Sequence, residues 1–323
     1  MPAALCLLDH TKADSPALEN AVELPPSHEV WNLRKASADD VATLYDQAPV
    51  IGLRKYAPKV RTCSQSLTLT DVINQQTGEI TYKAESWKCH QRHCPICQSA
   101  RANKLQREFI AALPKIMEEV PQGVFLMLTL TVRNCPITEL RPTLSEMGKA
   151  WKRLLRKPEL RIIRGWIRGT EVTKGESGPM MAHPHYHVLL LVPPYYFSGK
   201  SYIKHARWVE LWQDAARLNY PPAIDIRRVK TAQSGFAEAV KAATYSVKPS
   251  NLTDDPSWFH ELHEQVSGLR FLATGGVIKA VLRESGQSDD LADTPEPDGE
   301  VARSRVFGWN RPIRRYRLRK EPT

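Results

Sequence analysis

The sequence lacks any apolar run close to the roughly 20 residues that a membrane-spanning helix needs. The apolar stretch of residues 3–8 has no basic leader before it and is too short for an export signal. A G-x-x-x-x-G-K-[ST] phosphate loop is also missing. We therefore expect a cytoplasmic protein without a membrane span and without this signature of nucleotide-driven motors.

Cysteines and acidic residues are both scarce. Structural disulfides are not expected for the six cysteines, because the cytoplasm is reducing. Only 35 Asp and Glu stand against 45 Lys and Arg, which gives a formal net charge of +10. This balance favours a polyanionic partner, either nucleic acid or an acidic membrane surface, although a soluble protein can also be basic without one.

Four of the cysteines are better explained as metal ligands. Cys94 and Cys97 form a C-x-x-C knuckle, which is a zinc signature when two more ligands lie nearby. The further candidates are Cys63 and Cys89, with His90 or His93 as a replacement for one thiolate. A redox C-x-x-C and unrelated buried cysteines are the rival interpretations, but no thioredoxin-like strand–motif–helix context is present. We expect a closed, structural zinc site.

Hydrophobic periodicity predicts helices and strands from residue 53 onward. A hairpin is expected from segments 66–70 and 80–83, with a turn at Thr77-Gly78. Further strands are expected at 123–132, 165–173, 183–192 and 224–229, and helices at 99–117, 144–155, 202–218 and 235–246. Residues 1–52 show little pattern beyond a short helix near Ser37, and we expect an arm or a packing segment there.

Three histidines alternate along one strand. In the segment 183–192, His183, His185 and His187 occupy every second position, so their imidazoles project from one face of the strand. Neutral imidazole is the commonest protein metal ligand. The pattern therefore favours a metal site, and the alternative is a strand with surface histidines.

A glutamate in the preceding strand completes a candidate site. Two neighbouring strands, 165–173 and 183–192, place Glu171 close to His185 and His187. One carboxylate and two imidazoles make an open, three-ligand site for a divalent ion such as Mn or Mg, with positions left for substrate oxygens.

The helix expected at 235–246 carries a tyrosine among charged residues. Glu238, Lys241 and Tyr245 are three and four residues apart and share a helix face, with Lys248 just beyond. Such a tyrosine is either an activated nucleophile or an amphipathic packing residue.

Taken together, these motifs resemble the HUH endonucleases, and more closely the replication initiators of small rolling-circle plasmids. The residues that carry the resemblance are an apolar strand (125–131), Glu171-Val172-Thr173, His183-Pro184-His185-Tyr186-His187 and Tyr245-x-x-Lys248. The C-x-x-C segment and the sequences at 269–271 and 275–279 also match, so the resemblance spans Cys63 to Lys279.

The resemblance implies an α+β fold with a central antiparallel, ferredoxin-like sheet flanked by helices, plus the zinc-binding segment. It implies that Glu171, His185 and His187 hold a divalent metal, Mn or Mg, with His183 in support. Tyr245 would be the nucleophile, with its pKa lowered by Lys248 or Lys241. Several family members carry a glutamate one turn before the tyrosine to activate water. Here Lys241 stands at that position, and Glu238 one turn further back is the remaining candidate.

The activity implied is nicking of one strand at the double-strand origin through a covalent 5′-phosphotyrosine, which leaves a 3′-hydroxyl primer, followed by rejoining of the ends. The implied partners are plasmid origin DNA, including single-stranded or hairpin DNA, a host helicase and a DNA polymerase, and no membrane. A relaxase or transposase with the same chemistry is one alternative. A non-catalytic, zinc-containing DNA-binding regulator is another.

The expected domains are an arm (1–52), a zinc-binding segment with a helix (53–120), a nicking-joining domain (121–284), an acidic linker (285–301) and a basic C-terminal segment (302–323). The last segment interleaves seven arginines and Lys320 with Phe307, Trp309 and Tyr316. Such a segment either binds phosphates and stacks on unpaired bases, or packs as a last strand with Trp309 and Ile313 on the core.

Overall fold

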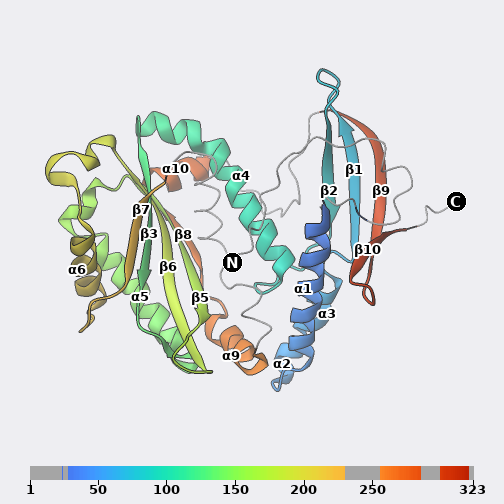
Figure 1. The fold of residues 1–323 in the computed structure, drawn as a ribbon, viewed down its shortest axis with the longest axis horizontal. Coiled ribbons are helices and arrows are strands. Elements are labelled where there is room, and N and C mark those ends of the chain that lie inside the picture. Colours follow the sequence, from blue (N-terminus) through green and yellow to red (C-terminus); the bar gives the residue numbers. More distant parts are fainter. Residues whose placement is uncertain (1–23, 25–27, 230–254, 285–298, 320–323) are drawn as a thin grey trace. The chain divides into compact units, whose positions relative to one another are not determined.

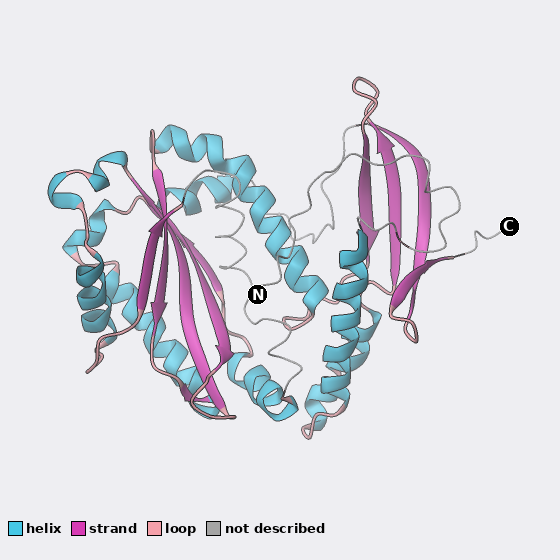
Figure 2. Cartoon of the chain, viewed as in Figure 1, coloured by secondary structure: helices cyan, strands magenta, loops and turns pink. Residues whose placement is uncertain are grey.

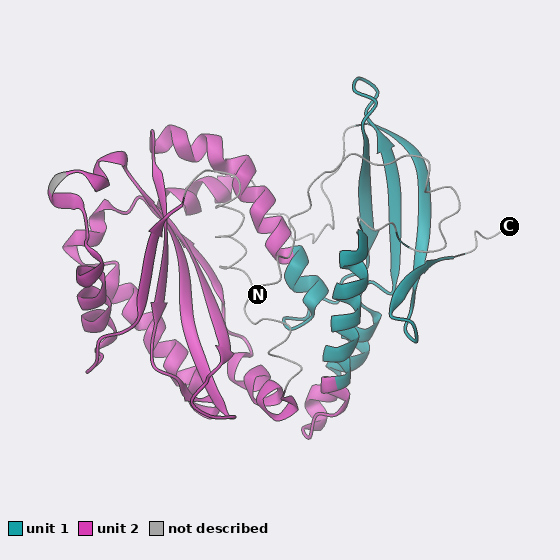
Figure 3. Ribbon diagram, in the orientation of Figure 1, with its two compact units in different colours: residues 1–43, 55–100, 290–323 teal, residues 44–54, 101–289 magenta. Residues whose placement is uncertain are grey.

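The structure, a computed structural model, describes residues 24, 28–229, 255–284 and 299–319. Its helices pack on two antiparallel β-sheets (Figures 1 and 2). The expected α+β class with antiparallel sheets is confirmed. The chain divides into two compact units, each with one sheet (Figure 3). Unit 1 comprises residues 1–43, 55–100 and 290–323, and unit 2 comprises residues 44–54 and 101–289.

Unit 1 contains a four-stranded sheet in the order β10-β9-β1-β2. Its strands are β1 (Ser66–Ile73), β2 (Ile80–Ser86), β9 (Glu300–Asn310) and β10 (Arg315–Leu318), and its helices are α3 (Tyr56–Thr62) and most of α1 (Glu29–Asp46). The expected hairpin is present as β1 and β2, but β1 also pairs with β9. Segments from opposite ends of the sequence therefore form one sheet.

Helix α1 packs against this sheet. The shared apolar core includes Trp31 and Ala36 of α1 and Leu67, Phe307 and Tyr316 of the strands. This 18-residue helix corrects the expectation of a poorly patterned arm with only a short helix near Ser37. The apolar periodicity of α1 is interrupted because two of its buried side chains, Lys35 and Asp39, are charged and neutralise each other.

Unit 2 contains a six-stranded antiparallel sheet in the order β7-β3-β6-β5-β8, with β4 also beside β6. Its strands are β3 (Val124–Thr131), β4 (Cys135–Pro136), β5 (Gly165–Lys174), β6 (Met181–Val192), β7 (Ile224–Arg228) and β8 (Leu272–Gly275). Its helices are α2 (Ile51–Arg54), α5 (Leu140–Leu154), α6 (His205–Ala216), α9 (Pro256–Val266) and α10 (Gly276–Glu284), together with α4 (Pro95–Glu119) from residue 101 onward. The sequence predicted β3, β5, β6 and β7, whereas α9, β8 and α10 were not expected.

The central strand β6 has helices on both of its faces (Figure 1). On one face, Leu189 belongs to an apolar core with Phe109 of α4 and with residues of α10. On the other face, Tyr186 contacts Trp212 of α6, with ring centroids 6.4 Å apart. Because side chains alternate along a strand, the three histidines share the face of Leu189 and lie nearer the start of β6. The helices α4 and α10 thus cover the apolar half of this face.

The junction of β8 and α10 depends on a glycine. Gly276 has φ of 62°, and a Cβ atom there would lie 2.1 Å from the backbone oxygen of Arg164. Glycine alone accepts this combination of a left-handed backbone and close approach. The chain can therefore turn directly from β8 into α10 and pack that helix beside β5.

Two expected segments fall largely outside the described residues. They are the helix at 235–246 and the acidic linker. The linker was expected to reach residue 301, but β9 already begins at Glu300. Among the described helices, none is long and apolar enough to cross a membrane.

Candidate metal centres and their surroundings

Strand pairing brings the carboxylate and the two imidazoles of the candidate site together. Glu171 of β5 lies directly opposite His185 of β6, and Gly169 lies opposite His187. The Glu171 Oε2 atom is 3.0 Å from His185 Nε2 and 2.8 Å from His187 Nε2. The proximity expected from the sequence is therefore present, and Glu171 and His185 are buried.

The other ring nitrogens show how the imidazoles are oriented. His185 Nδ1 lies 3.2 Å from the backbone oxygen of His183, and His187 Nδ1 lies 3.3 Å from the hydroxyl of Thr129 on β3. A backbone oxygen only accepts, so His185 Nδ1 carries the proton and donates. Its Nε2 would then carry a lone pair, which repels the oxygen of the carboxylate. The short distance between these two atoms therefore requires a second proton on the ring or a metal ion between them. Metal-binding histidines commonly use this arrangement.

The distances from the Glu171 oxygen to the two imidazole nitrogens are compatible with a shared divalent ion. Octahedral Mg²⁺ has ligand bonds of 2.0–2.1 Å, which puts neighbouring ligand atoms about 2.9 Å apart. The observed separations of 2.8 and 3.0 Å agree with this value. An octahedral ion held by only Glu171, His185 and His187 would keep positions free for other ligands.

The glutamate is ionised. Burial opposes its charge, but hydrogen bonds from His185 and His187 outweigh the burial and lower the pKa of Glu171 to about 2. A carboxylate that is charged at neutral pH, together with two imidazoles, is a donor set suited to a hard or borderline divalent cation.

His183 lies beside this group but is not one of its three ligand residues. Its Nδ1 is 2.7 Å from Asn134 Oδ1, and the Asn134 amide donates to the hydroxyl of Ser177 at 3.1 Å. Burial lowers the pKa of His183, and the charge of His185 lowers it further. Sequence reasoning missed Asn134 and Thr129. The threonine could have been noticed, because it interrupts an apolar strand on the histidine face.

The expected nucleophile and its neighbours, Glu238, Lys241, Tyr245 and Lys248, lie outside the described residues. The described chain resumes at Asp255, which pairs with Lys174 at 3.0 Å and caps α9 by accepting from the backbone N–H of Trp258. Lys174 lies three positions after Glu171 on β5. Because side chains alternate along a strand, Lys174 and Glu171 project to opposite faces of β5.

A second candidate centre consists of four buried cysteines in unit 1. Cys63, Cys89, Cys94 and Cys97 place their sulfur atoms within 4.8 Å of one another. Cys97 Sγ is 3.7 Å from Cys63 Sγ and 3.6 Å from Cys89 Sγ. A tetrahedral zinc ion with bonds of about 2.3 Å needs sulfurs about 3.8 Å apart, so the set fits zinc. Neither His90 nor His93 belongs to the group.

The environment of these sulfurs is compatible with a bound zinc ion. Burial raises the pKa of the Cys94 thiol, so a thiolate there requires a neighbouring positive charge. The backbone N–H of Cys89 points to Cys63 Sγ at 3.4 Å, a contact that is usual for zinc-bound thiolates in knuckles. All four donors come from protein, so the site is closed, as expected for a structural ion.

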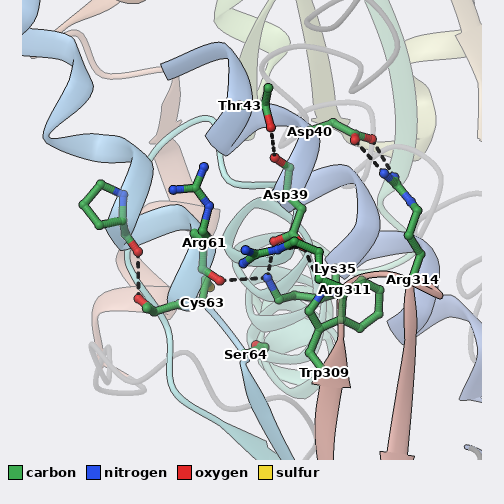
Figure 4. Close-up of polar contacts among 12 residues, drawn as sticks. Lys35, Asp39, Asp40, Thr43, Arg61, Cys63, Ser64, Trp309, Arg311 and Arg314 are labelled. Atoms are coloured by element: carbon green, nitrogen blue, oxygen red, sulfur yellow. Dashed lines mark hydrogen bonds and ion pairs between the residues drawn. The ribbon is translucent and has the colours of Figure 1, made fainter. Parts of the chain in front are cut away.

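Four of the seven arginines in the basic C-terminal segment pair with carboxylates of unit 1. Arg305 pairs with Asp71, Arg311 with Asp39, Arg314 with Asp40 and Arg315 with Glu29. Trp309 is buried and donates to Asp39 at 2.8 Å (Figure 4). These contacts favour the packing alternative for this segment. Ile313, which was expected on the core with Trp309, is instead 45% exposed.

Comparison with known proteins gives consistent matches. The family model described as "Replication protein" matches residues 81–317. A "Protein rep" from Bacillus amyloliquefaciens is 30% identical over 90% of this chain and 94% of its own length. A "Protein rep" from Streptococcus pneumoniae serotype 2 is 28% identical over 88% of this chain and 91% of its own. A "Replication protein" from Staphylococcus aureus is 27% identical over 64% of this chain. No solved structure matches the chain.

Proposed function

We propose that this chain, which belongs to the replication protein family of plasmid rolling-circle initiators, nicks one strand of origin DNA. It then rejoins the ends through a covalent tyrosine intermediate. The observation that carries this proposal is the convergence of Glu171, His185 and His187 on one face of the sheet in unit 2. The reaction is of the HUH type, and the antiparallel sheet with its flanking helices is compatible with that fold.

Glu171, His185 and His187 would hold a Mn or Mg ion at the nicking site. Such an ion offsets the charge that builds up on the phosphate oxygens during displacement. Thr129 and the backbone of His183 fix the imidazole rings, so both Nε2 atoms point to one position before substrate arrives. Asn134 holds His183 at the border of the same site.

Tyr245 is the proposed nucleophile. It precedes Asp255 by ten residues, and an extended chain of that length reaches about 33 Å, far enough to bring its phenol to the site. The ion pair of Asp255 with Lys174 ties the described chain after Tyr245 to the strand that carries Glu171, with the Lys174 side chain on the opposite face of that strand.

In the nicking step the phenol of Tyr245 loses its proton and its oxygen forms a bond to phosphorus. The bond from phosphorus to the 3′ oxygen breaks, and that oxygen takes up a proton to become the 3′-hydroxyl primer. Lysines 241 and 248 favour the phenolate, because a neighbouring positive charge lowers the pKa of a phenol. The reverse reaction rejoins the strand without ATP. Unwinding and synthesis are assigned to a host helicase and DNA polymerase.

Termination requires a side chain that activates an attacking group, either water or a second hydroxyl, toward the phosphotyrosine bond. Lys241 stands where relatives carry glutamate, so Glu238 is the candidate in this chain. Glu238→Ala should leave the first nick unchanged and slow the release of protein from DNA. Wild-type rates of both nicking and strand closure in this variant would exclude Glu238.

Zinc in the four-cysteine centre is assigned a structural role. Cys63 precedes β1, and Cys89, Cys94 and Cys97 lie around the start of α4, so one ion would join four separate points of the chain. Metal analysis of protein purified without chelator should find one zinc per chain.

The decisive experiment uses labelled single-stranded oligonucleotides tiled across the replicon that carries the gene, incubated with the full chain and Mn²⁺. We expect one oligonucleotide to be cleaved, with a covalent adduct that survives denaturation. Tyr245→Phe should abolish the adduct, and His187→Ala should abolish cleavage at low Mn²⁺. An adduct that persists in Tyr245→Phe contradicts the assignment. Absence of cleavage with intact DNA binding would point to the zinc-containing regulator instead.

A further inference from the structure

The loop after β6 presents three exposed aromatic rings. Tyr195, Phe197 and Tyr202 are 50%, 40% and 50% exposed. Aromatic side chains usually bury most of their large apolar surface. Several exposed rings in one short loop therefore suggest a binding surface rather than a packing accident.

The loop holds these rings in place. Tyr196 is buried between them, with its ring centroid 5.1 Å from that of Phe197 and 5.7 Å from that of Tyr202. A short helical turn, Pro194–Phe197, is closed by the hydrogen bond from the Tyr196 N–H to the oxygen of Pro193. A surface that is ordered before binding loses little conformational entropy when it meets its partner.

Two exposed guanidinium groups lie among the rings. Arg164 donates to the Tyr195 hydroxyl at 3.1 Å, and the Arg228 guanidinium lies 5.2 Å from the centre of the Phe197 ring. In the described part of the chain neither arginine pairs with a carboxylate. Nearby carboxylates are already engaged, since Asp225 lies 4.0 Å from Arg227 and Glu159 pairs with Arg207.

We infer that this aromatic–arginine patch (Arg164, Tyr195, Phe197, Tyr202 and Arg228) binds unpaired DNA. Exposed rings stack on bases of any sequence, and guanidinium groups contact phosphates, which together describe a platform for single-stranded nucleic acid. Protein-binding surfaces are also enriched in aromatic residues and arginine, so it is the formal net charge of +10 that favours a polyanion over a protein as the partner. The choice of DNA as the ligand rests on the proposed function. The position of the binding site rests on the exposed rings and guanidinium groups alone.

The patch is separate from the metal centre. Six residues of extended chain separate His187 from Pro193, which is roughly 20 Å along β6. Arg228 pairs with Leu126 on β3, and Leu126 lies on the face opposite to Thr129 and the histidines. The patch therefore contacts DNA away from the scissile phosphate, and its loss should weaken DNA binding without preventing cleavage of a short substrate.

The test measures binding of fluorescein-labelled dT30, which contains no origin sequence, by fluorescence anisotropy of the full chain. The double variant Tyr195→Ala, Tyr202→Ala should bind at least about 25-fold more weakly, because each stacked ring contributes at least about a fivefold factor. Arg164→Gln with Arg228→Gln should also reduce the slope of log Kd against log salt by about 1.4. All variants should still cleave the shortest oligonucleotide that the wild type cleaves.

The matched control removes two positive charges elsewhere. Lys279→Gln with Arg283→Gln changes exposed residues of α10 and should leave dT30 affinity within about twofold of wild type. Equal loss in this control would show a general charge effect and overturn the assignment.

A second measurement does not depend on variants. Photo-crosslinking of 5-iododeoxyuridine oligonucleotides to the wild-type chain should label Tyr195 or Tyr202. Crosslinks confined to other peptides, or wild-type dT30 affinity in the tyrosine double variant, would exclude the patch as a DNA site and leave it as a surface for a protein partner. If the chain binds dT30 through the patch but cleaves no oligonucleotide, the proposed function is wrong and the assignment of the patch as a DNA site stands.

Discussion

The hydroxyl of Thr129 lies 3.3 Å from Nδ1 of His187, across the pairing of β3 with β6. This contact fixes the imidazole with Nε2 directed to the carboxylate of Glu171. Outer hydrogen-bond partners of metal ligands typically change metal affinity by about 10- to 100-fold. The contact therefore predicts that Thr129 affects metal affinity, although it is not one of the three candidate ligands.

Thr129→Val keeps the shape of the side chain and removes the acceptor. We expect the Mn²⁺ concentration that supports half-maximal nicking to rise by about tenfold or more, with little change in rate at saturating Mn²⁺. Thr129→Ser keeps a hydroxyl and should restore the wild-type value. If the valine and serine variants show the same Mn²⁺ dependence, the hydroxyl does not orient His187.

Glu171→Gln should abolish nicking at Mn²⁺ concentrations that saturate the wild type. The neutral amide removes the single negative charge among the three candidate ligand groups, so the ion would lose its only charged ligand. Direct titration of Mn²⁺ by electron paramagnetic resonance should show at least about 100-fold weaker binding, since a ligand is lost rather than an outer partner. Glu176→Gln, in the exposed turn before β6, is the control and should titrate like the wild type.

Removal of one cysteine of the four-cysteine centre should destabilise unit 1. Cys97→Ser replaces a thiolate that lies 3.6–3.7 Å from two others, and structural zinc sites contribute directly to folding free energy. We expect loss of zinc and a lower midpoint of thermal unfolding. Cys135→Ser is the matched control, because Cys135 is a buried free cysteine outside the group. A fully stable, zinc-free Cys97→Ser protein would contradict a structural ion.

The sequence could predict the metal-ligand groups because each follows from short-range spacing. Alternation along one strand places His185 and His187 on one face, and an adjacent strand supplies Glu171. The cysteine group likewise depends on a knuckle and a neighbouring hairpin.

Long-range pairings were harder to predict. Nothing local in the sequence shows that Arg305 meets Asp71, or that Trp309 meets Asp39, because these pairs join opposite ends of the chain. Helix α1 was expected only as a short helix near Ser37, since its buried charges Lys35 and Asp39 interrupt the apolar periodicity. Hydrophobic periodicity predicts single strands and not which strands pair, so it could not predict that β9 joins β1 in one sheet.

Asp39 provides a test of that long-range arrangement through pH. Burial opposes its charge, but the hydrogen bond and the charge of Lys35 outweigh the burial, helped by Trp309 and Arg311, so the pKa of Asp39 is lowered (Figure 4). A carboxyl group with a lowered pKa in the folded state stabilises the fold above its unfolded pKa of about 3.9 and loses that contribution as pH falls through the folded value.

Asp39→Asn should therefore be most destabilising near neutral pH. Lys35 is fully buried, with Asp39 and the backbone oxygen of Arg61 as acceptors, and removal of one partner of such a buried pair costs about 3 kcal/mol. Urea unfolding followed by tryptophan fluorescence should show this difference at pH 7 and a smaller one as the pH falls below about 4. Asp40→Asn, which breaks the exposed pair with Arg314, should cost less than about 1 kcal/mol at pH 7. If the two variants are equally stable at pH 7, the buried network of Asp39 does not hold the C-terminal strands on α1.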